Sequence, residues 1–180
     1  MKVYVFNLKR LLIYLLVIAA AAAVVAGVSL KGADILDVFS ENRELPIYSV
    51  ECGEKVAAIT FDCAWGADDI PGILDTLRKA DVKATFFIVG QWAEKYPEKV
   101  EMIAAAGHDV ANHSYSHLRM GALDRTRIES EISRTNGILG KLSKTKVNLF
   151  RAPYGDYSNN VVSLARELGC FTIQWNVDAI

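Results

Sequence analysis

Five side chains that can do chemistry follow the predicted strands of this sequence, each near the point where a strand ends. They are an acid, two imidazoles, a guanidinium and a second acid: Asp62, His113, His117, Arg151 and Asp178. Because the carboxyl ends of parallel strands converge on one rim of an α/β architecture, we expect four separate segments to deliver these groups to one place. The sequence therefore predicts a single polar site at that rim.

The two histidines lie four residues apart in His113–His117 (HSYSH). One helical turn or a tight loop places both rings on the same side, where they can share one metal cation. Two surface histidines are an equally good interpretation of the pair alone, because short His pairs recur by chance. His108 stands between a helix stop and a strand, and it is predicted to be a structural histidine hydrogen-bonded to the backbone.

The segment Arg151–Gly155 (RAPYG) is typical of a strand end that turns sharply. An arginine there can orient a carboxylate and lower its pKa through the proximity of opposite charge. A surface arginine in a loop is the alternative. Trp175 is predicted either to line a platform for a sugar or to pack in the core, where an aromatic side chain in a strand lies more often.

Alternating strands and helices must position these residues. Strands are predicted at 47–50, 55–61, 84–89, 109–112, 147–150 and 171–175, with a turn at 52–54. Helices are predicted to begin near Ile70, Pro97, Asp124 and Ser158, with Asp124 as the cap of its helix, before a periodic apolar stripe. This alternation argues for an α/β fold with a parallel sheet or barrel. The number of βα units, about five, falls short of the eight of a complete (β/α)8 barrel.

The N-terminal segment 11–30 contains no charged residue, and all the basic residues before it lie within 1–10. About 20 apolar residues suffice for a helix to cross the hydrocarbon core, so 11–30 is predicted to be an uncleaved transmembrane signal-anchor. A cleaved signal peptide is the alternative, because 19–27 offers small residues for cleavage. The positive-inside rule keeps 1–10 cytoplasmic and places the rest outside the cell membrane. A stalk at 31–46 and a domain at 47–180 complete the division.

Composition excludes several classes of protein. The 180 residues are 52% hydrophobic and 23% charged, with a formal net charge of −1, which excludes a disordered chain, a disulfide miniprotein and a basic nucleic-acid binder. Without residues 1–30 the chain has 17 basic and 21 acidic residues, a net charge of −4. That balance gives no electrostatic basis for binding DNA or RNA. Three cysteines without CxxC spacing indicate no disulfide framework.

Several ordered motifs resemble those of the polysaccharide deacetylases, the NodB-homology domain or carbohydrate esterase family 4. They are ITFDCAWG (Ile59–Gly66), KATFFIVGQWAEKYPE (Lys83–Glu98), AGHDVANHSYSH (Ala106–His117), RAPYG (Arg151–Gly155) and QWNVD (Gln174–Asp178). The resemblance implies an incomplete, distorted (β/α) barrel and a divalent metal, zinc above all. It also implies removal of N-acetyl groups from peptidoglycan or a related glycan. The FDxxWG variant and the N-terminal anchor are most similar to the sporulation-associated, membrane-anchored branch.

The resemblance also implies roles for individual residues, carried over by matching position. Asp62 would be the general base, Arg151 would hold it, His113 and His117 would bind the metal, the backbone N–H of Tyr154 would bind the oxyanion, and Tyr154, Trp175 and Asp178 would contact the substrate. In this chemistry a metal polarises the acetamide carbonyl and lowers the pKa of its bound water. The general base takes the proton as water attacks.

The sequence departs from the family pattern in two places. The family has a second aspartate as the third metal ligand, and here Cys63 occupies that position. Three alternatives follow: zinc is bound by Cys63 and the two histidines, Asp68 or Asp69 supplies the third ligand from the following loop, or the metal site is weakened. We rank a missing or weakened ligand above cysteine ligation, because a buried cysteine usually behaves as a small hydrophobe. The family also continues to a histidine that acts as the general acid. The sequence stops before that segment, at Ile180, so we expect a domain truncated at its C-terminus.

Three functions are consistent with these features. The leading one is metal-dependent deacetylation of an N-acetylated glycan by a membrane-anchored domain outside the cytoplasm. The second is a catalytically impaired pseudoenzyme that binds glycan with the same fold, which Cys63 and the absent general acid motivate. The third is a different metal-dependent amidohydrolase that acts on a small substrate with a C–N bond.

Overall fold

A five-stranded parallel sheet organises the part of the chain that this computed structural model describes, residues 17–19 and 43–178. The strands stand in the same order in the sheet as in the sequence: β1 (Thr60–Cys63), β2 (Thr85–Ile88), β3 (Asp109–Asn112), β4 (Leu149–Phe150) and β5 (Phe171–Thr172). Every neighbouring pair is parallel. The predicted α/β fold with a parallel sheet is therefore confirmed.

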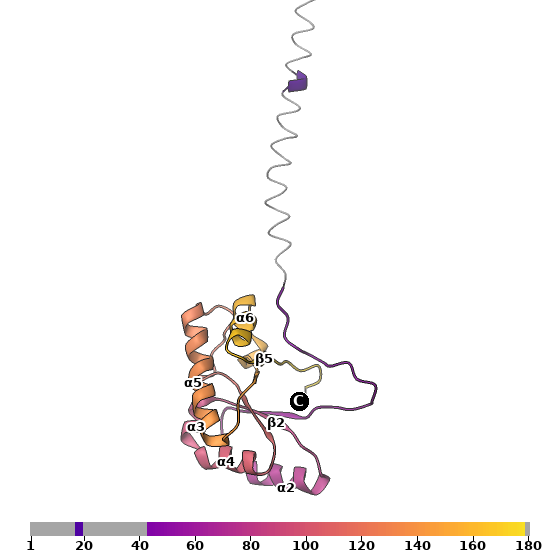
Figure 1. Cartoon of the computed structure of the whole chain (residues 1–180), viewed down its shortest axis with the longest axis vertical. Helices are drawn as coiled ribbons and strands as arrows, with labels where there is room; N and C mark the ends of the chain where they lie inside the picture. The colour runs from indigo at the N-terminus through magenta and orange to yellow at the C-terminus, as the bar shows by residue number, and fades with distance from the viewer. Residues whose placement is uncertain (1–16, 20–42, 179–180) are drawn as a thin grey trace, which may run out of the picture. The chain divides into compact units, whose positions relative to one another are not determined.

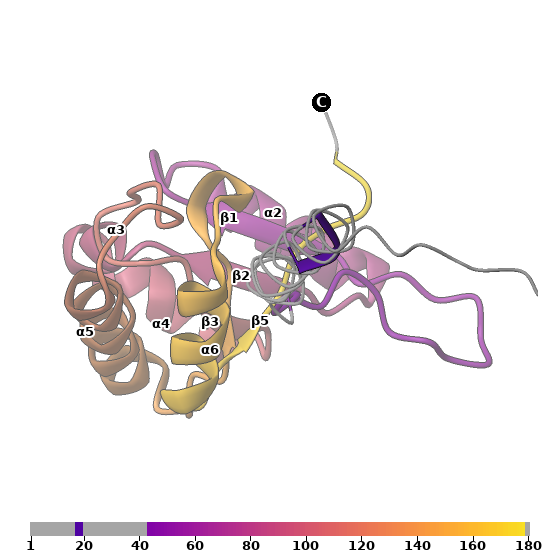
Figure 2. The same ribbon diagram turned by 90° about the horizontal axis from the view of Figure 1, so that it is seen from above.

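Helices fill each connection between the strands (Figure 1). They are α2 (Ile70–Ala80), α3 (Gly90–Lys95), α4 (Pro97–Ala105), α5 (Arg125–Ser143), the short 3₁₀ helix η1 (Pro153–Gly155) and α6 (Asn159–Glu167). The long helix α5 packs against α3, α4, α6 and β3, and Figure 2 shows α3, α4 and α5 gathered on one side of the strands. Asp124 caps α5 as predicted, because its carboxylate accepts a hydrogen bond from the Arg127 N–H at 2.8 Å.

Alternation along the strands separates an apolar face from a polar one. Phe86 and Ile88 of β2 are fully buried in the apolar cluster between the sheet and helices α2, α3 and α4. A second apolar cluster joins α5 and α6 around Phe150 of β4. Asp62 of β1 and its register partner Phe87 of β2 point to the opposite face. Each stands between two residues of the apolar cluster: Phe61 and Cys63 in β1, and Phe86 and Ile88 in β2. The helices thus cover one face of the sheet, and the predicted catalytic carboxylate stands on the other.

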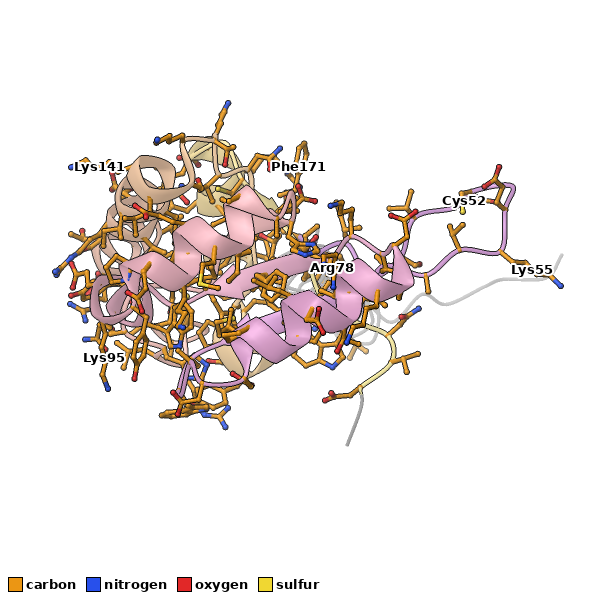
Figure 3. All side chains as sticks on the ribbon, turned by 90° about the horizontal axis from the view of Figure 1, so that it is seen from below. Cys52, Lys55, Arg78, Lys95, Lys141 and Phe171 are labelled. Carbon is orange, nitrogen blue, oxygen red and sulfur yellow. The ribbon has the colours of Figure 1, made fainter. Side chains whose placement is uncertain are left out.

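Of the two strands predicted at 47–50 and 55–61, the first is wrong and the second is present only from Thr60 onward. Ile47 instead pairs in parallel with Ile173, next to β5; its N–H donates to the Thr172 carbonyl and its carbonyl accepts from the Gln174 N–H, both at 2.8 Å. Strand β1 begins only at Thr60, one residue after Ile59, whose carbonyl accepts a hydrogen bond from the Thr85 N–H of β2 at 3.1 Å. The segment between is a loop that extends away from the helices, and Figure 3 shows Cys52 and Lys55 on it.

Most of the predicted anchor and stalk lies outside the described residues. Residues 17–19 of the anchor are helical. Among the residues that the structure describes, none belongs to a helix with the length and apolar character needed to span a membrane. Glu44, from the end of the predicted stalk, pairs with Arg166 at 2.9 Å and donates its backbone N–H to Asn159 at 3.0 Å. The last stalk residues therefore contact α6.

Candidate active site

An ion pair between β1 and the segment after β4 forms the centre of the site. Arg151 Nη1 lies 2.6 Å from Asp62 Oδ1. The Arg151 side chain is only 4% exposed; its guanidinium lies 3.9 Å from the centre of the Phe87 ring and 5.4 Å from that of Trp175. Because these rings confine the guanidinium, it holds the carboxylate in one orientation and engages Oδ1, so that Oδ2 faces elsewhere.

His113, which directly follows β3, faces that second oxygen. Its Nδ1 lies 2.8 Å from the Arg151 carbonyl oxygen; a carbonyl only accepts, so Nδ1 carries the hydrogen. Burial is the main cause that lowers the pKa of His113, so the ring is neutral near pH 7 and Nε2 carries a lone pair. The Nε2 atom is 3.6 Å from Asp62 Oδ2. Two acceptors that face each other beyond hydrogen-bond distance fit a cation or a proton donor between them.

His117 brings a second imidazole to the same place. Its ring centre is 5.1 Å from that of His113, and its backbone is left-handed, with φ of 55°. The N–H of His117 donates to the hydroxyl of Ser114 at 3.1 Å, which closes the loop between the two histidines. Its Nδ1 is buried and has no hydrogen-bond partner within the described part of the chain. Buried polar atoms are rarely left so, and a nitrogen of this kind fits a metal ligand.

The three candidates for a third metal ligand differ in their surroundings. Cys63 is 7% exposed and lies in the apolar cluster beside α2; burial, with the nearby charges of Asp62 and Asp69, raises the pKa of its thiol to about 12. Zinc binds the thiolate, so a thiol of this kind is a poor donor. Asp68 and Asp69 are exposed at the start of α2. Within residues 17–19 and 43–178, no three His, Cys, Asp or Glu side chains form a group that could hold a metal ion. The donors that remain for a metal are the two imidazoles, whose ring centres lie 5.1 Å apart and of which His117 has a buried nitrogen without a hydrogen-bond partner in the described part of the chain.

Exposed aromatic rings border the histidines. Tyr154 is 54% exposed and its ring centre is 4.7 Å from that of His117. Trp65 is 79% exposed, and its ring centre is 5.6 Å from that of His117. Trp175 lies against the RAPYG turn, where a Cβ atom added to Gly155 would come within 3.3 Å of the indole. Sequence reasoning missed Trp65, although it stands three residues after Asp62 in the same motif.

Asp178 stands apart from this group. It is exposed, and no contact of its side chain with Asp62 or Arg151 is present among the described residues. The structure thus brings together Asp62, His113, His117, Arg151, Tyr154 and Trp175, and it leaves Asp178 outside. His108, predicted to be structural, does accept a hydrogen bond from the backbone N–H of Ala84 at 3.3 Å. That prediction is confirmed.

Sequence reasoning also missed the buried polar residues that support the loop between the histidines. Asn112 is fully buried. Its side-chain Oδ1 accepts from the Ser114 N–H at 2.8 Å, and its side-chain Nδ2 donates to the Ile132 carbonyl at 2.9 Å. The side chain thus joins the loop to α5. Asn112 sits directly before His113 as the last residue of β3, and its polar side chain next to the first histidine was the available signal.

The chain is similar to known proteins over most of residues 43–178. The family model of the polysaccharide deacetylases matches residues 49–173. The peptidoglycan-N-acetylglucosamine deacetylase of Bacillus cereus is 37% identical over 123 residues, which are 68% of this chain and 45% of that protein. The chain spans about half of the length of this relative.

Solved structures are similar as well. A CE4 family pseudoenzyme from Bacillus anthracis superposes with a TM-score of 0.71 and 36% identity, covering 73% of this chain and 47% of that one. A mutant of that pseudoenzyme with restored enzymatic activity gives the same TM-score with 37% identity, over 73% of this chain and 48% of the other. The similarity thus extends to a protein that lacks the activity and to its repaired form.

Proposed function

Because the chain belongs to the polysaccharide deacetylase family, we propose that it hydrolyses the amide bond of N-acetylated sugars in peptidoglycan or a related cell-wall glycan and releases acetate. One observation carries this proposal: the Asp62 carboxylate, held by Arg151 at 2.6 Å, faces the neutral imidazole of His113 at 3.6 Å. A general base can activate the attacking water, and a cation can polarise the amide carbonyl, so the two together suit amide hydrolysis. The similarity to a peptidoglycan deacetylase supports the substrate class.

Asp62 acts as the general base in this proposal. Arg151 occupies Oδ1, so Oδ2 is the oxygen that takes the proton from the attacking water. The aromatic rings beside the guanidinium keep the arginine in place while that proton is transferred. A positioned general base contributes about 10²- to 10⁴-fold in rate.

His113 and His117 hold the divalent metal, for which zinc is our proposal. The chemistry that a bound metal supplies is polarisation of the acetamide carbonyl and a lowered pKa of water. The hydrogen bond from Nδ1 of His113 to the Arg151 carbonyl fixes the tautomer and leaves Nε2 as the donor. The backbone N–H of Tyr154 would stabilise the oxyanion that forms on the carbonyl oxygen.

The aromatic rings at the edge of the site support a glycan as the substrate. The faces of pyranose rings carry C–H groups that pack on aromatic side chains, and Trp65 and Tyr154, which both contact the His117 ring, expose more than half of their surface. Trp175 lies next to Arg151, deeper in the site. The rings would hold a sugar chain while one acetamido group reaches Asp62.

We also propose the surroundings in which this domain works. The uncharged segment 11–30 and the basic residues before it support a single-pass anchor in the cell membrane, with the domain outside the cytoplasm. Protease accessibility in intact cells tests the orientation: a domain that stays protected contradicts it.

The sequential order of the parallel strands supports a distorted, incomplete (β/α) barrel. The FDxxWG motif supports a role in sporulation.

Acetate release tests the proposed function. The full chain is incubated with zinc and N-acetylated peptidoglycan fragments, and acetate and free amines are measured together. We expect equal amounts of both products and loss of activity after chelation. Free amines without acetate, or acetate release unchanged by the chelator, contradict metal-dependent deacetylation. Ammonia in place of acetate would favour a different amidohydrolase.

A glycan-binding pseudoenzyme is the second candidate, and two observations favour it. Cys63 stands where the family places a metal-binding aspartate and points into the apolar cluster, and a similar solved structure is a pseudoenzyme. This candidate predicts retention on insoluble peptidoglycan without bound metal and without acetate release. Stoichiometric zinc in the purified chain excludes it.

A further inference from the structure

We propose that Glu131 is a positioning residue for the metal site: its buried carboxylate holds the loop between His113 and His117 in the shape that lets both rings face one cation. This inference rests on the proposed function and deepens it. Glu131 lies on α5, more than ten residues after the loop, and its side chain touches neither Asp62 nor a histidine in any contact found among the described residues. It acts through the backbone of the loop.

The carboxylate of Glu131 is buried and makes four polar contacts. The residue is 1% exposed. Its Oε2 accepts the backbone N–H groups of Tyr115 at 2.9 Å and Ser116 at 2.7 Å, and its Oε1 accepts the hydroxyl of Ser116 at 2.6 Å. Arg127, one turn earlier on α5, adds an ion pair at 2.9 Å. Three of these four contacts are made to the loop itself. Hydrogen bonds to a charged acceptor are stronger than those between neutral groups, so these three hold the loop firmly.

The opposite side of the loop is fixed by α3. The backbone N–H groups of Gly90 and Gln91, at the start of that helix, donate to the carbonyl oxygens of Ser114 at 2.9 Å and Tyr115 at 3.0 Å. The first N–H groups of a helix have no partner within it, so the loop satisfies them. The carbonyls thus bind α3 and the amides bind Glu131. Removal of the carboxylate frees one side of the loop and leaves the other in place.

The backbone of the loop explains why it needs such support. Ser114 and His117 both have left-handed φ angles, 64° and 55°. Non-glycine residues in this region are strained, and the strain persists only where the surroundings over-determine the conformation. Glu131 binds the two amides between these strained residues. Without it, the loop can relax, and the two imidazoles then no longer share one direction.

The experiment compares E131A, E131Q and E129A in the full chain. Glu129 is an exposed glutamate on the same helix, so E129A is the matched control. Hydrogen–deuterium exchange of the Tyr115 and Ser116 amides is measured without metal, and the zinc dissociation constant is measured by competition with a chromophoric chelator. Circular dichroism checks that each variant is folded. None of these readouts requires turnover.

We expect E131A to lose protection of both amides and to bind zinc about 10- to 100-fold more weakly, the usual cost of losing a residue that supports a metal ligand. E131Q keeps an oxygen for the two amides, so it retains most of the protection and loses less affinity. E129A behaves as the wild type. A folded E131A with wild-type protection and zinc affinity overturns the proposal, and so does an equal loss in E129A.

E131D keeps the test decisive if E131A does not fold. The shorter side chain keeps the charge and withdraws the oxygens from the loop, so both amides should lose protection; unchanged exchange in E131D overturns the proposal. The test is also separable from the proposed function. A wild type that binds zinc and releases no acetate refutes deacetylation, and the effect of Glu131 on the loop and on zinc still stands or falls by these measurements.

Discussion

The two faces of the sheet differ most clearly at two adjacent residues of β1. Asp62 faces Arg151 and His113, whereas Cys63 is buried among the apolar side chains beneath α2. One step along a strand therefore separates a residue for chemistry from a residue for stability. The family aspartate at position 63 would put a second carboxylate there, and this chain has instead a thiol whose pKa burial raises to about 12.

The largest effect is expected on the polar face, from D62N. The amide cannot take the proton from the attacking water, so kcat for acetate release should fall by about 10²- to 10⁴-fold. The free energy of unfolding should change little, because Asp62 is partly exposed and the amide oxygen still accepts from Arg151. Asp109, exposed at the amino end of β3, supplies the control D109N, which should keep full activity. A D62N variant as active as D109N would show that the faces are assigned wrongly.

The apolar face is tested by C63D. A carboxylate placed at a position that is 7% exposed has no cation beside it in the cluster, and we expect roughly 3 kcal/mol or more of lost stability. Urea unfolding measures the loss. C52D, at an exposed cysteine, should leave the stability unchanged.

The contrary result for C63D is equally clear. If residue 63 faces the histidines instead, the new carboxylate joins the metal site: C63D then binds zinc more tightly and gains activity with little loss of stability. That outcome would remove the distinction between Asp62 and Cys63 on which the comparison rests.

A smaller effect is expected from W65A. If the indole packs on a sugar ring, its loss should cost about 1 kcal/mol of binding, or about fivefold in KM for an oligosaccharide, with kcat nearly unchanged. Trp65 is 79% exposed, so the fold should not suffer. Phe171, an exposed aromatic at the start of β5, supplies the control F171A. A fall in kcat without a change in KM would speak against a role in binding.

The smallest effect is expected at the amino ends of the strands, where His108 lies. Burial above all, and then the charge of Lys83, lowers the pKa of His108 from 6.5, and the neutral ring accepts from the Ala84 N–H. Its contribution to stability is therefore complete above pH 6.5 and is lost as the pH falls through the lowered pKa. We expect this contribution to the free energy of unfolding to be about 0.5 kcal/mol. Urea unfolding of H108Q should show less loss between pH 7.5 and pH 5 than the wild type does; an identical loss would contradict this assignment.

Local sequence patterns predicted the parts of the fold that local interactions determine. The continuous apolar run at 84–89 contains β2, and the predicted strand at 109–112 coincides with β3. Asp124 was predicted to cap α5 because a carboxylate before a periodic apolar stripe satisfies the first N–H groups of a helix. The convergence of Asp62, His113 and Arg151 followed from their places after parallel strands. These features need no knowledge of distant contacts.

Features that depend on distant contacts were missed. Ile47 was predicted to begin a strand at 47–50, but only a single bridge forms there, and its partner is Ile173, at the far end of the domain. No role was predicted for Glu131, because its partners, the amides of the loop, carry no sequence signal. Cys63 could be placed on either face until the register of β1 was known. Side-chain direction at a strand end is set by tertiary pairing.

The central claim is that the face of the sheet with Asp62 is a metal-dependent deacetylase site, and zinc content measured together with acetate release tests it most directly. The wild type and an H113A/H117A double variant are compared with N-acetylated peptidoglycan fragments as the substrate. We predict about one zinc per wild-type chain and acetate release that follows it, with both lost in the double variant. Acetate release that is unaffected by alanine at both histidines would contradict the account.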